Sequence, residues 1–210
     1  GIQNLRETHD KFFLSDLYGL DRNHINVVHG NSLEVENGSA ESFIQLMAFA
    51  RSNDLSVATN YEHLSSKMDI GNYIDYMVMQ TYFGNEDWPL NNVLVWNTDS
   101  VESKWRWLFY DLDGAMNRTD RDPFQFLDGS QENQPLLFAK LVANDVFKNL
   151  FLTRYLHHLS STFRPQQLAP IVDRFISAYE NEIENHVTRW SNPSSREAWY
   201  QNCLGFYYFF

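Results

Sequence analysis

Four polar side chains in two nearby stretches have the types and the spacing to do chemistry. Asp87 lies in an acidic loop, and Asn92 follows five residues later. Asp111 follows the aromatic run of residues 105–110, and Asp113 stands two residues further on. Phosphoryl transfer from a metal-bound nucleotide uses such groups: one carboxylate orients the attacking hydroxyl, while an amide oxygen and a second carboxylate hold Mg²⁺. Mg²⁺ takes oxygen ligands and as a rule uses only one or two protein carboxylates.

The spacing of these residues supports that chemistry without deciding it. The offset from Asp87 to Asn92 equals the offset from Asp to Asn in the protein-kinase catalytic loop, and Asp111 stands where a kinase places its metal-binding Asp. The sequence has neither an HRD nor a DFG tripeptide. The alternative is an acidic surface loop and a strand end, where Asp and Asn are common turn residues. On spacing alone both interpretations stay open.

Asp111 and Asp113 extend a predicted strand. The two-residue period of a strand places them on the same face, next to each other. Two adjacent carboxylates repel each other unless a cation or several hydrogen-bond donors lie between them, which favours a metal site. The individual role of Asp113 is left open.

A helix and a hairpin must position these residues. The pattern predicts a helix over residues 70–83 that begins after Asp69 as N-cap and ends at Gly84, a residue suited to the left-handed conformation past a helix C-terminus. Two β-rich runs follow, residues 93–97 and 104–110, joined by a polar turn.

The remaining elements are mostly helical. A strand is predicted over residues 24–29, followed by a polar connection over 30–38, and a helix after Ser39 as N-cap. From residue 134 onward the chain reads as helical. Residues 165–190 are predicted to form one long helix, and Ser194 with Glu197 a capping box for the last one. The expected fold class is therefore α+β, mostly helical, with a small β-hairpin beside the candidate site.

Composition excludes several classes of protein. The chain has 210 residues, 16% of them aromatic, which is typical of a globular protein with a real core. A formal charge of −11 disfavours nucleic acid as a partner, because a phosphate backbone is bound by clustered Lys and Arg. The single cysteine, Cys203, excludes an internal disulfide framework and multi-cysteine zinc sites. No apolar run approaches the roughly 18 residues of a transmembrane helix, so no transmembrane segment is expected.

The chain resembles the CotH family, the spore coat protein H kinases and their relatives. The resemblance is carried by residues 53–96, which end in GNEDWPLNNVLVW, and by KWRWLFYDLDG at 104–114. It extends to LRETHDKFFLSDLYGLD at 5–21 and SREAW at 195–199. One departure is visible after Asp113: relatives usually continue to an aromatic residue and a glycine, whereas this chain reads GAMN.

The resemblance implies an atypical protein-kinase-like fold that binds ATP with Mg²⁺ or Mn²⁺ and phosphorylates protein hydroxyls. Asp87 matches the catalytic Asp, Asn92 the Asn of the catalytic loop and Asp111 the metal-binding Asp, with Asp113 as a second acidic position at the metal and nucleotide. Glu7 could pair with a nucleotide-binding Lys upstream of residue 1, or it is a surface residue. The implied partner is a protein substrate of the spore coat or cell surface, which leaves the compartment open.

The organisation expected from the resemblance is a single kinase-like domain over residues 1–210. We interpret it as a fragment that lacks the N-terminal nucleotide-gripping lobe, because Gly1 is not a natural start. Residues 1–38 would end the N-terminal part, 39–133 hold the catalytic loop and hairpin, and 134–210 form a helical scaffold. Two other functions remain: a pseudokinase or binding module without turnover, and a metal-dependent phosphohydrolase in which water is the acceptor.

Overall fold

The computed structural model describes residue 2 and residues 8–100, 102–117, 120, 122–127, 129 and 132–210. The chain divides into two compact units, Glu7–Arg154 and Gly1–Arg6 with Tyr155–Phe210. The expectation of a single domain over 1–210 stays a prediction. No helix in the described part of the chain is long and apolar enough to cross a membrane.

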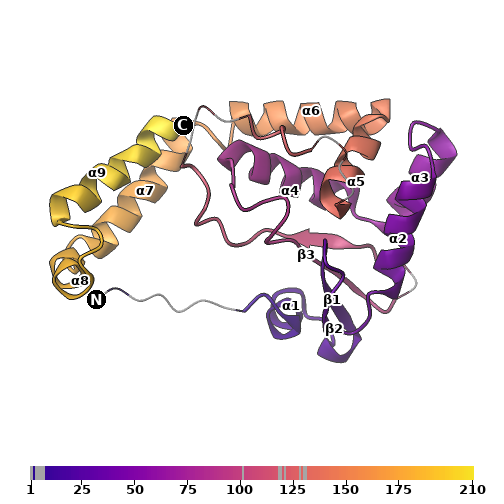
Figure 1. Ribbon diagram of the computed structural model, residues 1–210, viewed down its shortest axis with the longest axis horizontal. Helices are drawn as coiled ribbons and strands as arrows, with labels where there is room; N and C mark the ends of the chain where they lie inside the picture. The colour runs from indigo at the N-terminus through magenta and orange to yellow at the C-terminus, as the bar shows by residue number, and fades with distance from the viewer. Residues whose placement is uncertain are drawn as a thin grey trace. The chain divides into compact units, whose positions relative to one another are not determined.

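The larger unit is built on a four-stranded antiparallel sheet with the order β2-β1-β3-β4 (Figure 1). Its strands are β1 Ile25–His29, β2 Val35–Asn37, β3 Leu94–Thr98 and β4 Arg106–Leu108. Its helices are α1 Lys11–Tyr18, the 3-10 helix η1 Arg22–His24, α2 Glu41–Ser52, α3 Ala58–Lys67, α4 Ile70–Phe83 and α5 Asn133–Val142. The fold is therefore α+β and mostly helical, as the sequence predicted.

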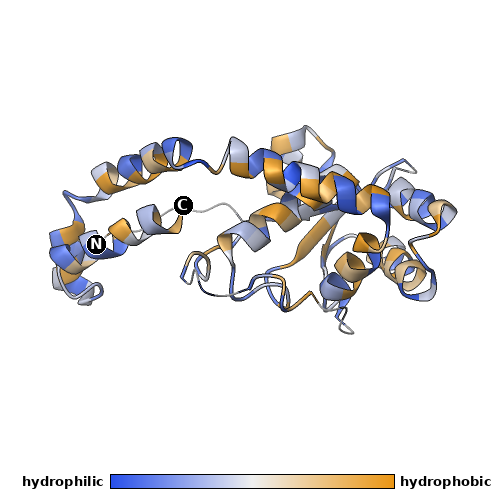
Figure 2. Cartoon of the chain, turned by 90° about the horizontal axis from the view of Figure 1, so that it is seen from above, coloured by the Kyte–Doolittle hydropathy of each residue, from blue (hydrophilic) through white to orange (hydrophobic). Residues whose placement is uncertain are grey.

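Both faces of the sheet are covered. On one face the α1 residue Leu14 packs with five strand residues: Ile25, Val27, Leu94, Trp96 and Leu108. On the other face the ring of Trp107 lies 4.6 Å from that of Tyr73 in α4, and its Nε1 donates to Gln134 of α5 at 2.9 Å. In Figure 2 the strand visible beneath the helices is coloured hydrophobic, and the helices carry both hydrophobic and hydrophilic residues.

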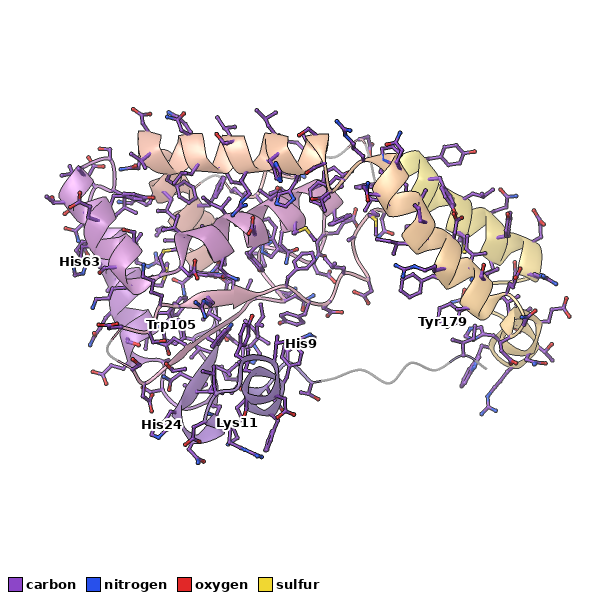
Figure 3. The ribbon with its side chains drawn as sticks, turned by 180° about the vertical axis from the view of Figure 1, so that it is seen from behind. His9, Lys11, His24, His63, Trp105 and Tyr179 are labelled. Atoms are coloured by element: carbon purple, nitrogen blue, oxygen red, sulfur yellow. The ribbon has the colours of Figure 1, made fainter. Side chains whose placement is uncertain are left out.

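Trp105 extends this second layer just before β4. It is 1% exposed, its ring lies 5.0 Å from that of Phe43 in α2, and its backbone N–H donates to Lys67 at the end of α3. Figure 3 shows it beside these helices. Burying such large aromatic rings contributes much of the apolar area that stabilises a domain, so Trp105 belongs to the core.

Local signals predicted α4 and the hairpin correctly. The Asp69 carboxylate accepts from the N–H of Asn72 at 3.1 Å, and Gly84 ends the helix with φ 59°. Strands β3 and β4 pair antiparallel, with Leu94 opposite Leu108 and Trp96 opposite Arg106. Strand β4 is shorter than the predicted run 104–110. Ser39 was predicted one position too early as the N-cap of α2, because Ala40 holds that position.

The described residues of the smaller unit contain three complete helices, and two predictions about them were wrong. They are α7 Pro165–Tyr179, α8 Ile183–Trp190 and α9 Arg196–Phe209, while α6 Asp145–Ser160 spans residues of both units. The single helix predicted over 165–190 is interrupted after Tyr179, because α7 and α8 both pack against α9 and the chain has to turn between them. The cap of α9 is Ser195, whose Oγ accepts from the N–H of Ala198 at 3.0 Å, and not Ser194.

Candidate active site

A cleft of about 490 Å³ brings all four predicted side chains together. Three segments line it: the chain at the end of β1, the loop between α4 and β3, and the chain after β4. The lining residues are His29, Asn31, Ser32, Asp87, Leu90, Asn91, Asn92, Val93, Tyr110, Asp111 and Asp113. Asp87, Asn92, Asp111 and Asp113 are thus neighbours around one space, whereas Glu7 lies outside the described residues.

Strand pairing places the three segments side by side. His29 at the end of β1 is opposite Leu94 at the start of β3, and the N–H of Gly30 donates to the carbonyl of Val93 at 2.8 Å. Leu94 is in turn opposite Leu108 of β4. The cleft therefore lies at the end of the sheet where β1 finishes, β3 begins and β4 finishes.

Backbone hydrogen bonds join the loop after α4 to the chain after β4. The N–H of Glu86 donates to the carbonyl of Gly114 at 3.1 Å, and the N–H of Met116 donates to that of Phe83 at 2.7 Å. The loop that carries Asp87 is therefore attached to the segment that carries Asp111 and Asp113.

Two of the cleft residues have a left-handed backbone. Asn92 has φ 57° and Asp111 has φ 55°. Asn and Asp adopt this conformation more readily than other residues with a Cβ, but it still costs free energy relative to the right-handed regions. Conformations of this kind gather at functional sites, where the rest of the fold holds them in place.

The cleft is acidic, and its carboxylates have no compensating partner among the residues that the structure describes. Asp87, Asp111 and Asp113 are exposed, and no hydrogen bond or ion pair joins their carboxylates to any residue that the structure describes. The described lining includes no Lys or Arg; its one basic side chain, His29, has Nε2 3.6 Å from Glu36. Carboxylates gathered without a protein cation favour a bound cation from solution.

Tyr110 adds a neutral hydroxyl to this wall. Its burial, with a smaller contribution from the neighbouring charge of Asp111, raises the pKa of Tyr110 to about 12. The ring is held against that of His9, with 5.0 Å between the centroids. At neutral pH Tyr110 therefore stays protonated.

The donor set fits a metal ion that is shared with phosphate oxygens. Among the described residues no group of three or more His, Cys, Asp and Glu side chains is placed to hold a metal by itself. Two carboxylates and an amide oxygen suit Mg²⁺, which keeps several waters and takes its other ligands from a nucleotide.

Several cleft residues were missed by sequence reasoning. Asn31 connects three segments: its Nδ2 donates to the carbonyls of Pro89 at 2.6 Å and Leu90 at 3.0 Å, and its Oδ1 accepts from the N–H of Gln134 at 3.3 Å. His29 and Ser32 line the cleft beside it. The sequence analysis predicted no more than a strand end and a polar connection for these residues. The pairing of β1 with β3 is what brings them close to Asp87.

This geometry defines a class of protein: a mixed α+β fold with an acidic cleft at the end of an antiparallel sheet. The family model described as CotH kinase protein matches residues 18–205. The chain therefore belongs to the CotH family, as the resemblance predicted, and membership indicates a kinase-like function at the level of the family. No curated protein and no solved structure matches the chain.

Proposed function

We propose that this cleft transfers the terminal phosphoryl group of ATP to a Ser or Thr hydroxyl of a protein, with Mg²⁺ or Mn²⁺ as the metal. One observation carries the proposal: three carboxylates that pair with no described residue and the left-handed Asn92 surround a single cleft in a chain of a kinase family. The order of helix, acidic loop, hairpin and strand-end Asp is also that of a kinase catalytic region. On this basis we propose that the larger unit corresponds to the C-terminal lobe of a kinase-like fold.

Asp87 is the proposed catalytic residue. Its carboxylate is exposed and forms no hydrogen bond or ion pair with a described residue, so both oxygens are free to accept a hydrogen bond from a substrate hydroxyl. By accepting that bond it would orient the hydroxyl oxygen toward the phosphorus and receive its proton. The acceptor protein would belong to the spore coat or cell surface, as the family resemblance suggests.

Asn92 and Asp111 are the proposed metal ligands, with Asp113 beside them. A bound Mg²⁺ or Mn²⁺ would bridge phosphate oxygens and offset their charge. This matters here, because the described cleft lining offers no Lys or Arg to do so. For Glu7, which lies outside the described residues, the proposed role is to pair with a nucleotide-binding Lys.

Labelled ATP given to the full-length protein, with Mg²⁺ or Mn²⁺ and a mixture of Ser- and Thr-containing proteins, tests the proposal. Label on protein supports a kinase, free labelled phosphate indicates a phosphohydrolase, and absence of turnover indicates a pseudokinase or binding module. Asp87→Asn should abolish transfer. Asp16→Asn, at an exposed position on α1 that does not line the cleft, is the matched control and should keep it.

A further inference from the structure

Asn85 is the buried polar side chain next to the candidate cleft. It is 5% exposed, although the Asp87 carboxylate two residues later faces solvent. It follows Gly84, the residue that ends α4, and it does not line the cleft itself. A buried amide in a loop is costly unless its hydrogen-bonding groups have partners.

The Asn85 amide makes three such hydrogen bonds. Its Nδ2 donates to Gln80 Oε1 in the last turn of α4 at 3.1 Å and to the backbone carbonyl of Asp111 at 3.2 Å. Its Oδ1 accepts from the backbone N–H of Asp87 at 3.4 Å. One side chain therefore binds the backbone of the proposed catalytic residue, the backbone of the proposed metal ligand and the helix that precedes them.

Only an amide of this length can make that set of bonds. A carboxylate in its place would keep the acceptor for Asp87 but would lose both N–H donors, and an alanine would lose all three bonds. Gln80 is fully buried, and its Nε2 has no hydrogen-bond partner in the described part of the chain.

The space around Asn85 is tight on the side of Gly114. A Cβ added at Gly114 would lie 3.3 Å from Asn85 Oδ1 and 3.4 Å from Asp87 Oδ2. The Asn85 amide oxygen, the Asp87 carboxylate and the backbone of Gly114 are thus close neighbours.

We propose that Asn85 is a positioning residue that sets where Asp87 lies relative to Asp111. The role rests on the proposed function, because it matters only if those two residues act on one substrate. Asn85 touches neither substrate nor metal; it acts through the backbone of both loops. Misplacing reacting groups by about 1 Å can cost on the order of 10²-fold in rate. We therefore expect Asn85→Ala to lower kcat by about 10- to 100-fold, with a smaller change in KM for the protein substrate.

Asn144 provides a control matched in burial and bonding. It is also 5% exposed, its Nδ2 donates to the carbonyl of Leu55 at 2.8 Å, and its Oδ1 accepts from the N–H of Val146 at 3.0 Å and of Phe147 at 3.2 Å. It caps α6 and does not line the cleft. Asn144→Ala should lower the melting temperature at least as much as Asn85→Ala, yet keep kcat per folded molecule.

The experiment compares wild type, Asn85→Ala and Asn144→Ala in the full-length protein by kinetics and by hydrogen exchange. In Asn85→Ala the amides of Glu86 and Asp87 should exchange faster; in Asn144→Ala the change should fall on Val146 and Phe147. An Asn85→Ala enzyme with unchanged kcat, or two variants that lose kcat in proportion to stability, would overturn the positioning role.

If wild type transfers no phosphoryl group, the proposed function fails. Exchange then still decides the structural part, because unchanged rates at Glu86 and Asp87 would show that Asn85 does not hold this loop.

Discussion

Asn92 and Asp111 stand 19 positions apart in the chain, yet both have a left-handed backbone and both line one cleft. The hairpin of β3 and β4 joins them, so the same element that separates them in sequence brings them together in space. Both residues adopt a backbone conformation that costs free energy. We infer that the direction this conformation gives their side chains serves the function of the site.

Replacing Asn92 by glycine should therefore separate stability from function. Glycine adopts the left-handed conformation without a Cβ penalty, at the cost of a more flexible unfolded chain. We expect the free energy of unfolding of Asn92→Gly to stay the same or rise by up to about 1 kcal/mol, while binding of Mn²⁺ with ATP weakens. Urea unfolding and calorimetry on the full-length protein measure the two effects.

Ser191→Gly is the control for that variant. Ser191 also has a left-handed backbone, with φ 54°, but it ends α8 in the smaller unit. It should show the same small change in stability with unaltered ATP binding. Equal binding of Mn²⁺ and ATP by Asn92→Gly and wild type would remove Asn92 from the metal site.

Asp87→Asn should change the reaction and not the fold. Because the carboxylate has no hydrogen bond or ion pair to a described residue, its removal should alter the free energy of unfolding by no more than about 0.5 kcal/mol. Loss of a general base typically costs about 10²- to 10⁴-fold in rate. Thermal unfolding and phosphoryl transfer, measured on the same preparation, test both parts. A lowered melting temperature would mean that Asp87 braces the loop, and retained transfer would contradict its catalytic role.

Gly114→Ala should lower activity without unfolding the protein. The new Cβ would press on Asn85 Oδ1 at 3.3 Å, so that atom must move by a few tenths of an ångström, and it would touch Asp87 Oδ2 at 3.4 Å. We expect kcat to fall by about tenfold, since catalysis is sensitive to small displacements of reacting groups. Gly205→Ala, inside α9 with no atom within 4 Å of the added Cβ, is the control and should leave kcat unchanged. Equal kcat values for the two variants would show that the site tolerates the shift.

Tyr110 should make stability depend on pH in the alkaline range. Burial and the charge of Asp111 raise its pKa from 10 to about 12 in the folded protein, so the folded state holds the proton more tightly than the unfolded chain. The stabilisation is then fully present below pH 10 and is lost as the pH rises from 10 through 12. Urea unfolding at several pH values should show a smaller loss in Tyr110→Phe than in wild type. Identical slopes would mean that other tyrosines account for the whole effect.

Elements with strong local signals could be predicted from the sequence. Helix α4 has a side-chain cap at Asp69 and a left-handed glycine at Gly84, and both signals depend only on residues next to the helix ends. Strands β1 and β3 alternate or cluster apolar residues enough to be found. Strand β2, Val35–Asn37, was missed because it is a short, largely exposed edge strand without alternation.

Features that depend on distant partners could not be predicted. The interruption between α7 and α8 follows from packing on α9, which no pattern within 165–190 contains. No local pattern identifies Asn85, since its partner Asp111 lies 26 positions away. The four candidate residues themselves were found because their types and order match a known chemistry. Their convergence on one cleft is now a geometric finding, whereas their roles stay predictions.

The turn between β3 and β4 can change in length without moving the cleft residues, whereas the chain between the strand pair and the cleft cannot. Leu94 pairs with Leu108, so Asn92 stands two residues before this pair and Asp111 three residues after it. An insertion between Thr98 and Arg106 leaves that count intact, whereas one added residue between Leu108 and Asp111 would change it and displace the carboxylate relative to Asn92. Among relatives, insertions and deletions should therefore accumulate at the far turn of the hairpin, while the few residues on the cleft side keep a constant number.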